Sequence, residues 1–275
     1  MKLNEIFGFL LVLLAIYLGV HASGAADAND DLFDGDPAAD VDVHVDEDKD
    51  TNNDHDGDEP ENAIARSDFC RNAIGESRFN DLGEGYDEAV QCMEAAGVVT
   101  GVDSNTYAPR DALTRAQAAS TIAALITSAN RLERSDANIR ALPEAPQARF
   151  VDVEPDSPHA DAIARLNEAG IIEGYVDARY EPQGRVSRAQ MASIIDRTYK
   201  YMTGDALPAG ADQFSDDDQS VHEDSINAVA AAGIMGGTGG LQFDPNQSVR
   251  RGPMAAFRAR TMIRLEETER IRPLE

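Results

Sequence analysis

The chain has 275 residues, of which 42% are hydrophobic, enough for one or two packed domains. Its formal charge of −26, from 50 acidic against 24 basic residues, argues against nucleic acid as a partner, because such binding releases counterions to a basic face. With two cysteines and 12 prolines in no repeat, disulfide scaffolds, zinc ribbons and collagen-like chains are excluded as well.

The first predicted element is an apolar run over Ile6–Val20, followed by small residues. Its length suits the core of a secretory signal and falls short of the roughly 20 residues that cross a bilayer as a helix. We expect residues 1–22 to be a signal peptide cleaved after Ala22, with Ala26 or Ala28 as alternative sites, which leaves no stable membrane span. The weakly basic amino-terminal flank keeps an uncleaved anchor as the alternative. Both forms place the remaining chain outside the cytoplasmic membrane.

Residues 23–68 form an acidic segment. From Asp27 to Asp68 there are 17 acidic residues against Lys49 and Arg66. Such a sequence cannot bury enough apolar surface to offset the entropy of ordering it. We expect a disordered, self-repelling and extended spacer.

Beyond the spacer, one pattern of landmarks occurs three times. Each copy opens with Phe-x-Asp and continues through Gly-x-x-x-Gly, an aromatic-x-Pro and an arginine, with the proline twelve residues after the first glycine and the arginine six residues after the proline. The copies open at Phe79, Phe150 and Phe214, have their first glycines at Gly97, Gly170 and Gly233, and end in Arg115, Arg188 and Arg251. Identical spacing in three copies indicates an internal repeat.

Each repeat predicts two helices joined by a loop. Apolar residues spaced three or four apart precede the first glycine, which suits a helix C-cap with positive φ. A second helix is expected to begin around Thr114, Ser187 and Arg250, where hydroxyl groups can N-cap the first two copies. One repeat of about 50 to 65 residues is marginal alone, so the three must share a core.

With these landmarks, the three copies resemble S-layer homology repeats, in a form similar to those of actinobacteria. The resemblance implies a mainly α fold with three helix-loop-helix repeats in a pseudo-threefold module. It also implies non-covalent attachment to a bacterial cell wall through grooves between repeats. The expected boundaries are repeat 1 at 69–130, a linker at 131–148, repeat 2 at 149–206 and repeat 3 at 207–275.

The resemblance also implies which residues bind an anionic wall polymer. These are the motif arginines Arg115, Arg188 and Arg251, the hydroxyl groups of Thr114 and Ser187, the amides of Gln117 and Gln190, and the loop glycines Gly101, Gly174 and Gly237. Arginine fits this task, because its planar fork pairs bidentately with a carboxylate or phosphate.

Two observations qualify this assignment. In the third copy, Arg250-Arg251-Gly252-Pro253 lacks the hydroxyl and the amide, so this groove is expected to contribute least. The motif arginines also have a structural alternative, in which each braces its own repeat by pairing with Asp81, Asp152 or Asp216.

Other residues give weaker signals. Cys70 and Cys92 can form a disulfide in an oxidising compartment, or remain a free thiol and a core residue. The segment from Asn52 imitates the start of a calcium loop, but its twelfth position is Ala63 where an EF-hand needs glutamate. His159 and His222 are expected at the surface or at helix caps. We therefore predict no specific metal site and no cofactor.

Two other classes of function stay open. Wall hydrolases often have similar repeats, but the sequence shows no nucleophile elbow, zinc motif or paired catalytic carboxylates, so we expect no enzyme. A surface-lattice subunit acting by protein-protein association is the second alternative. The preferred expectation is an exported protein at the wall or surface of a bacterium, bound to an anionic glycan or to peptidoglycan, with a further protein partner unknown.

Overall fold

The computed structural model of the chain describes residues 63–83, 85–144 and 150–275. All of these residues belong to one structural unit, Leu32–Glu275. A separate unit, Met1–Asp31, lies outside the described residues.

The predicted signal peptide, 1–22, and most of the predicted spacer, 23–68, also lie outside the described residues. The end of the spacer range differs from the expectation, because Ala63–Arg66 forms the short helix α2. Ile64 of this helix is buried. Helical structure is therefore present before Asp68, where the apolar side chain of Ile64 packs in the core.

The described residues are mainly helical, and strand pairing among them is limited to isolated bridges. Each repeat has a short helix followed by a long one, as the landmarks predicted. In chain order these are α3 at Asp87–Ala95 and α4 at Arg115–Arg131, α5 at Ala160–Glu168 and α6 at Arg188–Thr203, and α7 at Glu223–Ala231 and α8 at Arg251–Glu267.

The helices end and begin where local chemistry predicts. Gly97, Gly170 and Gly233 follow the short helices with φ of 70°, 70° and 67°, the left-handed region that favours glycine. Thr114 and Ser187 are the N-caps of α4 and α6, and each side chain accepts a hydrogen bond from the backbone of its helix. These predictions are confirmed.

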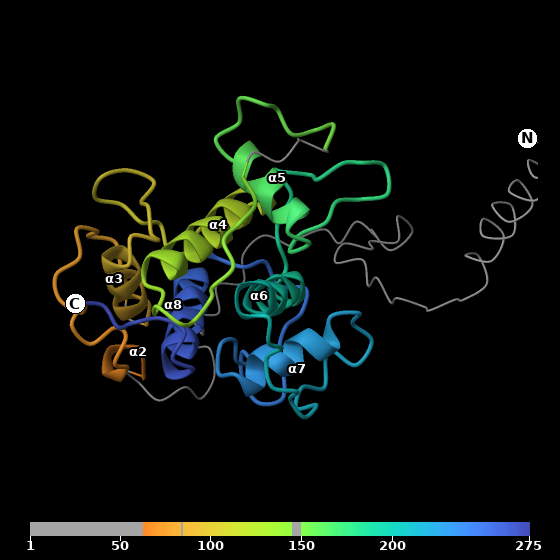
Figure 1. Cartoon of the computed structure of the whole chain (residues 1–275). Coiled ribbons are helices and arrows are strands. Elements are labelled where there is room, and N and C mark those ends of the chain that lie inside the picture. The colour runs from red at the N-terminus through yellow and green to blue at the C-terminus, as the bar shows by residue number, and fades with distance from the viewer. Residues whose placement is uncertain (1–62, 84, 145–149) are drawn as a thin grey trace, which may run out of the picture. The chain divides into compact units, whose positions relative to one another are not determined.

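Helices of neighbouring repeats pack in a cycle. The long helix of each repeat contacts the short helix of the next, so α4 packs on α5 and α6 packs on α7. The third pair, α8 on α3, returns from the last repeat to the first (Figure 1). The three repeats therefore share one core and close on themselves in pseudo-threefold order.

Three equivalent apolar residues, each two positions before a motif arginine, lie where the repeats meet. Leu113, Val186 and Val249 are 1%, 0% and 2% exposed. The backbone N–H of Leu113 donates to the carbonyl of Val249 at 2.9 Å, and the N–H of Val249 donates to Val186 at 2.9 Å. The segments that lead into the long helices thus pair across repeat boundaries.

The segments that flank the first repeat also join the core. Cys70 and Cys92 form a disulfide with their Cα atoms 5.3 Å apart, which ties the segment before the repeat to α3. Near the end of the chain, the N–H of Leu274 donates to the carbonyl of Phe69 at 3.2 Å. In the predicted linker, 131–148, apolar residues such as Ile139 are buried, so its described part packs on the repeats.

Candidate functional site

Each motif arginine is the first residue of a long helix and reaches into the loop of the next repeat. Its Nε donates to the carbonyl of the loop aromatic and its Nη2 to a carbonyl within Gly-x-x-x-Gly. The acceptors are Tyr180 (2.7 Å) and Glu173 (3.4 Å) for Arg115, Phe243 (2.7 Å) and Gly236 (2.6 Å) for Arg188, and Tyr107 (2.7 Å) and Thr100 (2.8 Å) for Arg251. The arginines therefore brace neighbouring repeats in the same cyclic order as the helices.

Burial separates the three arginines. Arg115 and Arg188 are each 2% exposed, whereas Arg251 is only partly buried. The guanidinium carbons lie 4.5 to 4.6 Å from the ring centres of the aromatics that they brace. Burial lowers the pKa of Arg115, although arginine stays charged in proteins. Arg115 and Arg188 thus make buried contacts between repeats, while part of the Arg251 side chain is accessible to solvent.

The motif aspartates have a different role from the expected pairing with an arginine. In every repeat, the aspartate of Phe-x-Asp accepts hydrogen bonds from two successive backbone N–H groups of its own loop. Asp81 accepts from Tyr107 and Ala108, Asp152 from Tyr180 and Glu181, and Asp216 from Phe243 and Asp244, all at 2.7 to 2.8 Å. The second residue of each pair has φ of 55° to 58°, so the carboxylate stabilises a left-handed residue before the proline.

The predicted hydroxyl and amide ligands form capping boxes. The N–H of Gln117 donates to Thr114 Oγ1 at 3.2 Å, and the N–H of Thr114 donates to Gln117 Oε1 at 3.0 Å. Ser187 and Gln190 repeat the arrangement at 3.2 and 3.1 Å. Arg250, at the same place in the third copy, makes no side-chain cap. These polar groups therefore serve the starts of α4 and α6.

Replacing Thr114 by alanine should lower the free energy of unfolding by about 1 kcal/mol, the usual cost of losing such a cap. Urea unfolding followed by circular dichroism measures this change. Thr114→Ser keeps the hydroxyl oxygen and should stay within a few tenths of a kcal/mol of the wild type. A stability of Thr114→Ala equal to that of Thr114→Ser would contradict the capping role.

The loop glycines provide space for the opening phenylalanines. A Cβ atom at Gly174 would lie 2.2 Å from the ring of Phe150. The corresponding distances are 2.4 Å for Gly101 and Phe79, and 2.8 Å for Gly237 and Phe214. Each glycine thus lets the loop pack against the phenylalanine of its own repeat. The spacing of the motif residues did not indicate this role within the repeat.

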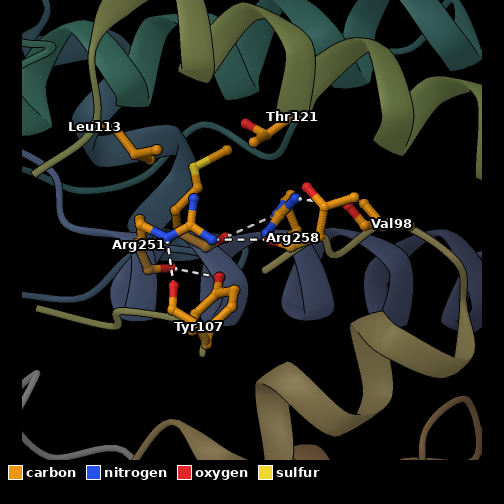
Figure 2. Close-up of a pocket in the computed structure, with 8 residues that line it drawn as sticks. Val98, Tyr107, Leu113, Thr121, Arg251 and Arg258 are labelled. Atoms are coloured by element: carbon orange, nitrogen blue, oxygen red, sulfur yellow. Dashed lines mark hydrogen bonds between the residues drawn. The ribbon is translucent and has the colours of Figure 1, made fainter. Parts of the chain in front are cut away.

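A small pocket lies between the third and first repeats. Arg251 and Arg258 of α8 line it together with Tyr107 and residues from α4 and the first loop, and its volume is about 20 Å³, room for one water-sized group. Figure 2 shows the two guanidinium groups side by side in this pocket. The third copy, expected to contribute least, therefore has two adjacent cations.

Arg258 is the residue that sequence reasoning missed. It is 2% exposed, and its Nη1 donates to the carbonyl of Val98 at 3.1 Å. Burial and the nearby charge of Arg251 lower its pKa. The equivalent residues of the other repeats, seven positions after the motif arginine, are Ile122 and Ile195, both fully buried. A comparison of the motifs does not include the position of Arg258. Only the fold shows that this arginine is buried beside Arg251, where the other repeats have an isoleucine.

The two guanidinium groups give this pocket a local positive charge. Among the described residues, no carboxylate forms an ion pair with Arg251 or Arg258, and both side chains donate hydrogen bonds to backbone carbonyls. Two adjacent guanidinium groups with little solvent repel each other and favour an anion between them. One oxygen of a carboxylate or phosphate matches the space.

The two predicted surface histidines connect repeats. His159 and His222 are the N-caps of α5 and α7, without a side-chain cap. The Nδ1 of His159 lies 2.7 Å from the Oγ of Ser120 in α4. The Nδ1 of His222 lies 2.9 Å from the Oγ of Ser193 in α6. They occupy cap positions as predicted, and they also link each short helix to the long helix before it.

Comparisons with known proteins agree with the internal repeat. The family described as S-layer homology domain matches at residues 78–119, 149–192 and 213–255. The chain is 26% identical over 201 residues to the Surface-layer 125 kDa protein of Lysinibacillus sphaericus, covering 72% of this chain and 16% of that protein. It is 27% identical over 194 residues to S-layer protein EA1 of Bacillus anthracis, covering 69% and 20%.

A further relative is named as an enzyme. The chain is 30% identical over 185 residues to Exoglucanase XynX of Acetivibrio thermocellus, covering 65% of this chain and 16% of that protein. The chain thus spans a fifth or less of the length of these three relatives. In the part that the structure describes, no helix is both long and apolar enough to cross a membrane.

Proposed function

The chain carries three S-layer homology domains, and from this premise we propose that it is attached to a bacterial cell wall by an anionic wall polymer bound between its repeats. The protein is exported and lies at the cell wall or cell surface. We assign no catalytic role to the described repeats. Relatives named as S-layer proteins and as an exoglucanase each match about two thirds or more of this chain, which supports a shared attachment module.

The observation that carries the proposal is the pocket of Arg251 and Arg258. Its two guanidinium groups are the adjacent cations that an anionic ligand requires. The proposed binding is centred on the junction of the third and first repeats, because Arg251 is only partly buried there and, with the buried Arg258, lines a pocket, whereas Arg115 and Arg188 are each 2% exposed. This junction differs from the other two by the presence of Arg258.

Net charge gives the site its selectivity. With a net charge of −26, the chain as a whole repels polyanions, so an anionic polymer can bind only where local cations are shielded from the other charges. In the pocket, one acidic group of the polymer is bound by the arginines, and neighbouring sugar units lie outside along the repeat boundary. This arrangement favours a polymer with isolated acidic groups.

Co-sedimentation of the secreted full-length protein with sacculi from the source organism tests this function. We expect binding to intact sacculi, and loss of most of it after chemical removal of the secondary polymers. Because the contact is electrostatic, binding should also weaken as salt rises. Binding that survives polymer removal would instead indicate peptidoglycan, and absence of binding to both preparations would contradict the proposed attachment.

A further inference from the structure

The opening of the third repeat has a buried carboxylate where the other repeats have apolar side chains. Asp217 occupies the position of Leu82 in the first repeat and Val153 in the second, which pack in the core or against it. Asp217 is only 1% exposed. A buried carboxylate is costly unless it is paired or bound to a metal ion.

Asp217 has no such compensation among the described residues. Neither of its carboxylate oxygens has a hydrogen-bond partner. Two further carboxylates approach it instead, those of the exposed residues Asp212 and Asp218, and one oxygen from each of the three lies within 4.8 Å of the other two. No basic side chain of the described residues forms an ion pair with this group.

The electrostatics of the three aspartates favour a cation. Burial raises the pKa of Asp217, and the charges of Asp212 and Asp216 raise it further. Carboxylates packed this closely repel one another when ionised, and a divalent ion that they share removes both the repulsion and the lost solvation. The acidic group therefore has the features of a ligand set for a cation.

We propose that Asp212, Asp217 and Asp218 bind a calcium ion in the third repeat. Ligand oxygens at about 2.3–2.6 Å from one Ca²⁺ can be separated by up to about 5 Å, which agrees with the distances between these three carboxylates. The donors are all oxygens, without histidine or cysteine, which favours calcium or magnesium over transition metals. Calcium fits better, because it accepts irregular geometry and additional ligands from water, whereas magnesium demands a near-ideal octahedron.

Such an ion would stabilise the third repeat at its opening. Asp212 precedes Phe214, while Asp217 and Asp218 follow Asp216, which holds the loop at Phe243 and Asp244. A shared cation would thus fix the segment that enters the repeat against the loop-binding aspartate. The site is distinct from the polymer pocket and stands whether or not the wall function holds.

Thermal unfolding of the full-length protein in calcium tests the site. Extracellular calcium-binding modules have dissociation constants of about 10⁻⁴–10⁻³ M, so 10 mM calcium is near saturating. We expect the melting temperature to rise by about 3–6 °C relative to sodium chloride of equal ionic strength. The same concentration of magnesium should give a smaller rise.

Asp217→Val supplies the decisive comparison, because valine is the native residue of the second repeat. This variant should melt no lower than the wild type without calcium, and calcium should no longer raise its melting temperature. Asp217→Asn, nearly identical in shape, should also lose the calcium response. Asp156→Asn removes an exposed carboxylate from the second repeat, and this variant should keep the calcium response of the wild type.

Two results would overturn the proposal. One is a wild type whose melting temperature is the same in calcium as in matched sodium chloride. The other is a calcium response in Asp217→Val equal to that of the wild type, which would locate the effect in diffuse binding to the many other acidic residues.

Discussion

Replacing Arg188 by alanine should lower the free energy of unfolding by about 3–5 kcal/mol. The guanidinium of Arg188 donates to the carbonyls of Phe243 and Gly236 at 2.7 and 2.6 Å, and it lies 4.6 Å from the ring centre of Phe243. Alanine leaves both carbonyls of the third repeat without this donor and a void at a boundary where the side chain is 2% exposed. The junction of the second and third repeats should open first.

Calorimetry or urea unfolding measures the effect, with a fall in melting temperature of roughly 10 °C expected for a protein of this size. Arg179→Ala is the matched control, because among the described residues the ion pairs of the Arg179 side chain, with Asp177 and Glu181, lie at the surface, and their loss should cost less than about 1 kcal/mol. An Arg188→Ala variant that loses wall binding at unchanged stability would show that the arginine is a ligand-binding residue instead of a brace.

Replacing Arg258 by isoleucine should reduce binding to intact sacculi by about 10- to 100-fold, equivalent to about 1.4–2.8 kcal/mol. This prediction depends on the proposed function. Isoleucine is the residue that the first two repeats have at this position, so the substitution makes the third junction like the others. Without ligand, two neighbouring guanidinium groups destabilise the fold, and an apolar side chain of suitable volume should leave stability unchanged or raise it by about 1–4 kcal/mol.

Binding isotherms with sacculi, together with melting temperatures, separate this result from simple unfolding. Arg71→Ala removes one positive charge at an exposed ion pair with Asp68 and should leave both quantities unchanged. If the Arg258→Ile variant binds sacculi as tightly as the wild type, the polymer does not bind in this pocket, and this part of the proposed function is wrong.

The local parts of the fold could be predicted from the sequence, because each depends on residues close together in the chain. Gly97 ends a helix through its own backbone freedom, and Thr114 begins one by bonding three residues ahead. The helix-loop-helix unit follows from such signals, and its repetition implies a shared core. The start of α2 was missed, because Ile64 is a single apolar residue at the end of a strongly acidic segment.

The side-chain contacts between repeats could not be predicted, because the spacing of residues within one repeat does not show which residues of a neighbouring repeat they contact. Arg115 was expected to bind a ligand or an acid of its own repeat, and its donors instead reach the loop carbonyls of the second repeat. Arg258 and Asp217 were missed for a related reason. Each is a charged residue in a charged chain, and it becomes unusual only when the fold shows that its apolar equivalents pack in the core or against it.

The cyclic contact of the repeats has a consequence for how the module can change during evolution. In an open stack, a unit can be added or lost at one end, because each unit contacts only its neighbours. Here the last long helix, α8, packs on the first short helix, α3, so every unit has two partners and the array has no free end. After duplication or deletion of a single unit, the long helix of the last unit and the short helix of the first would no longer be positioned to pack on each other. The copy number is therefore set by geometric closure, and sequence drift within each copy is the remaining route to new binding properties.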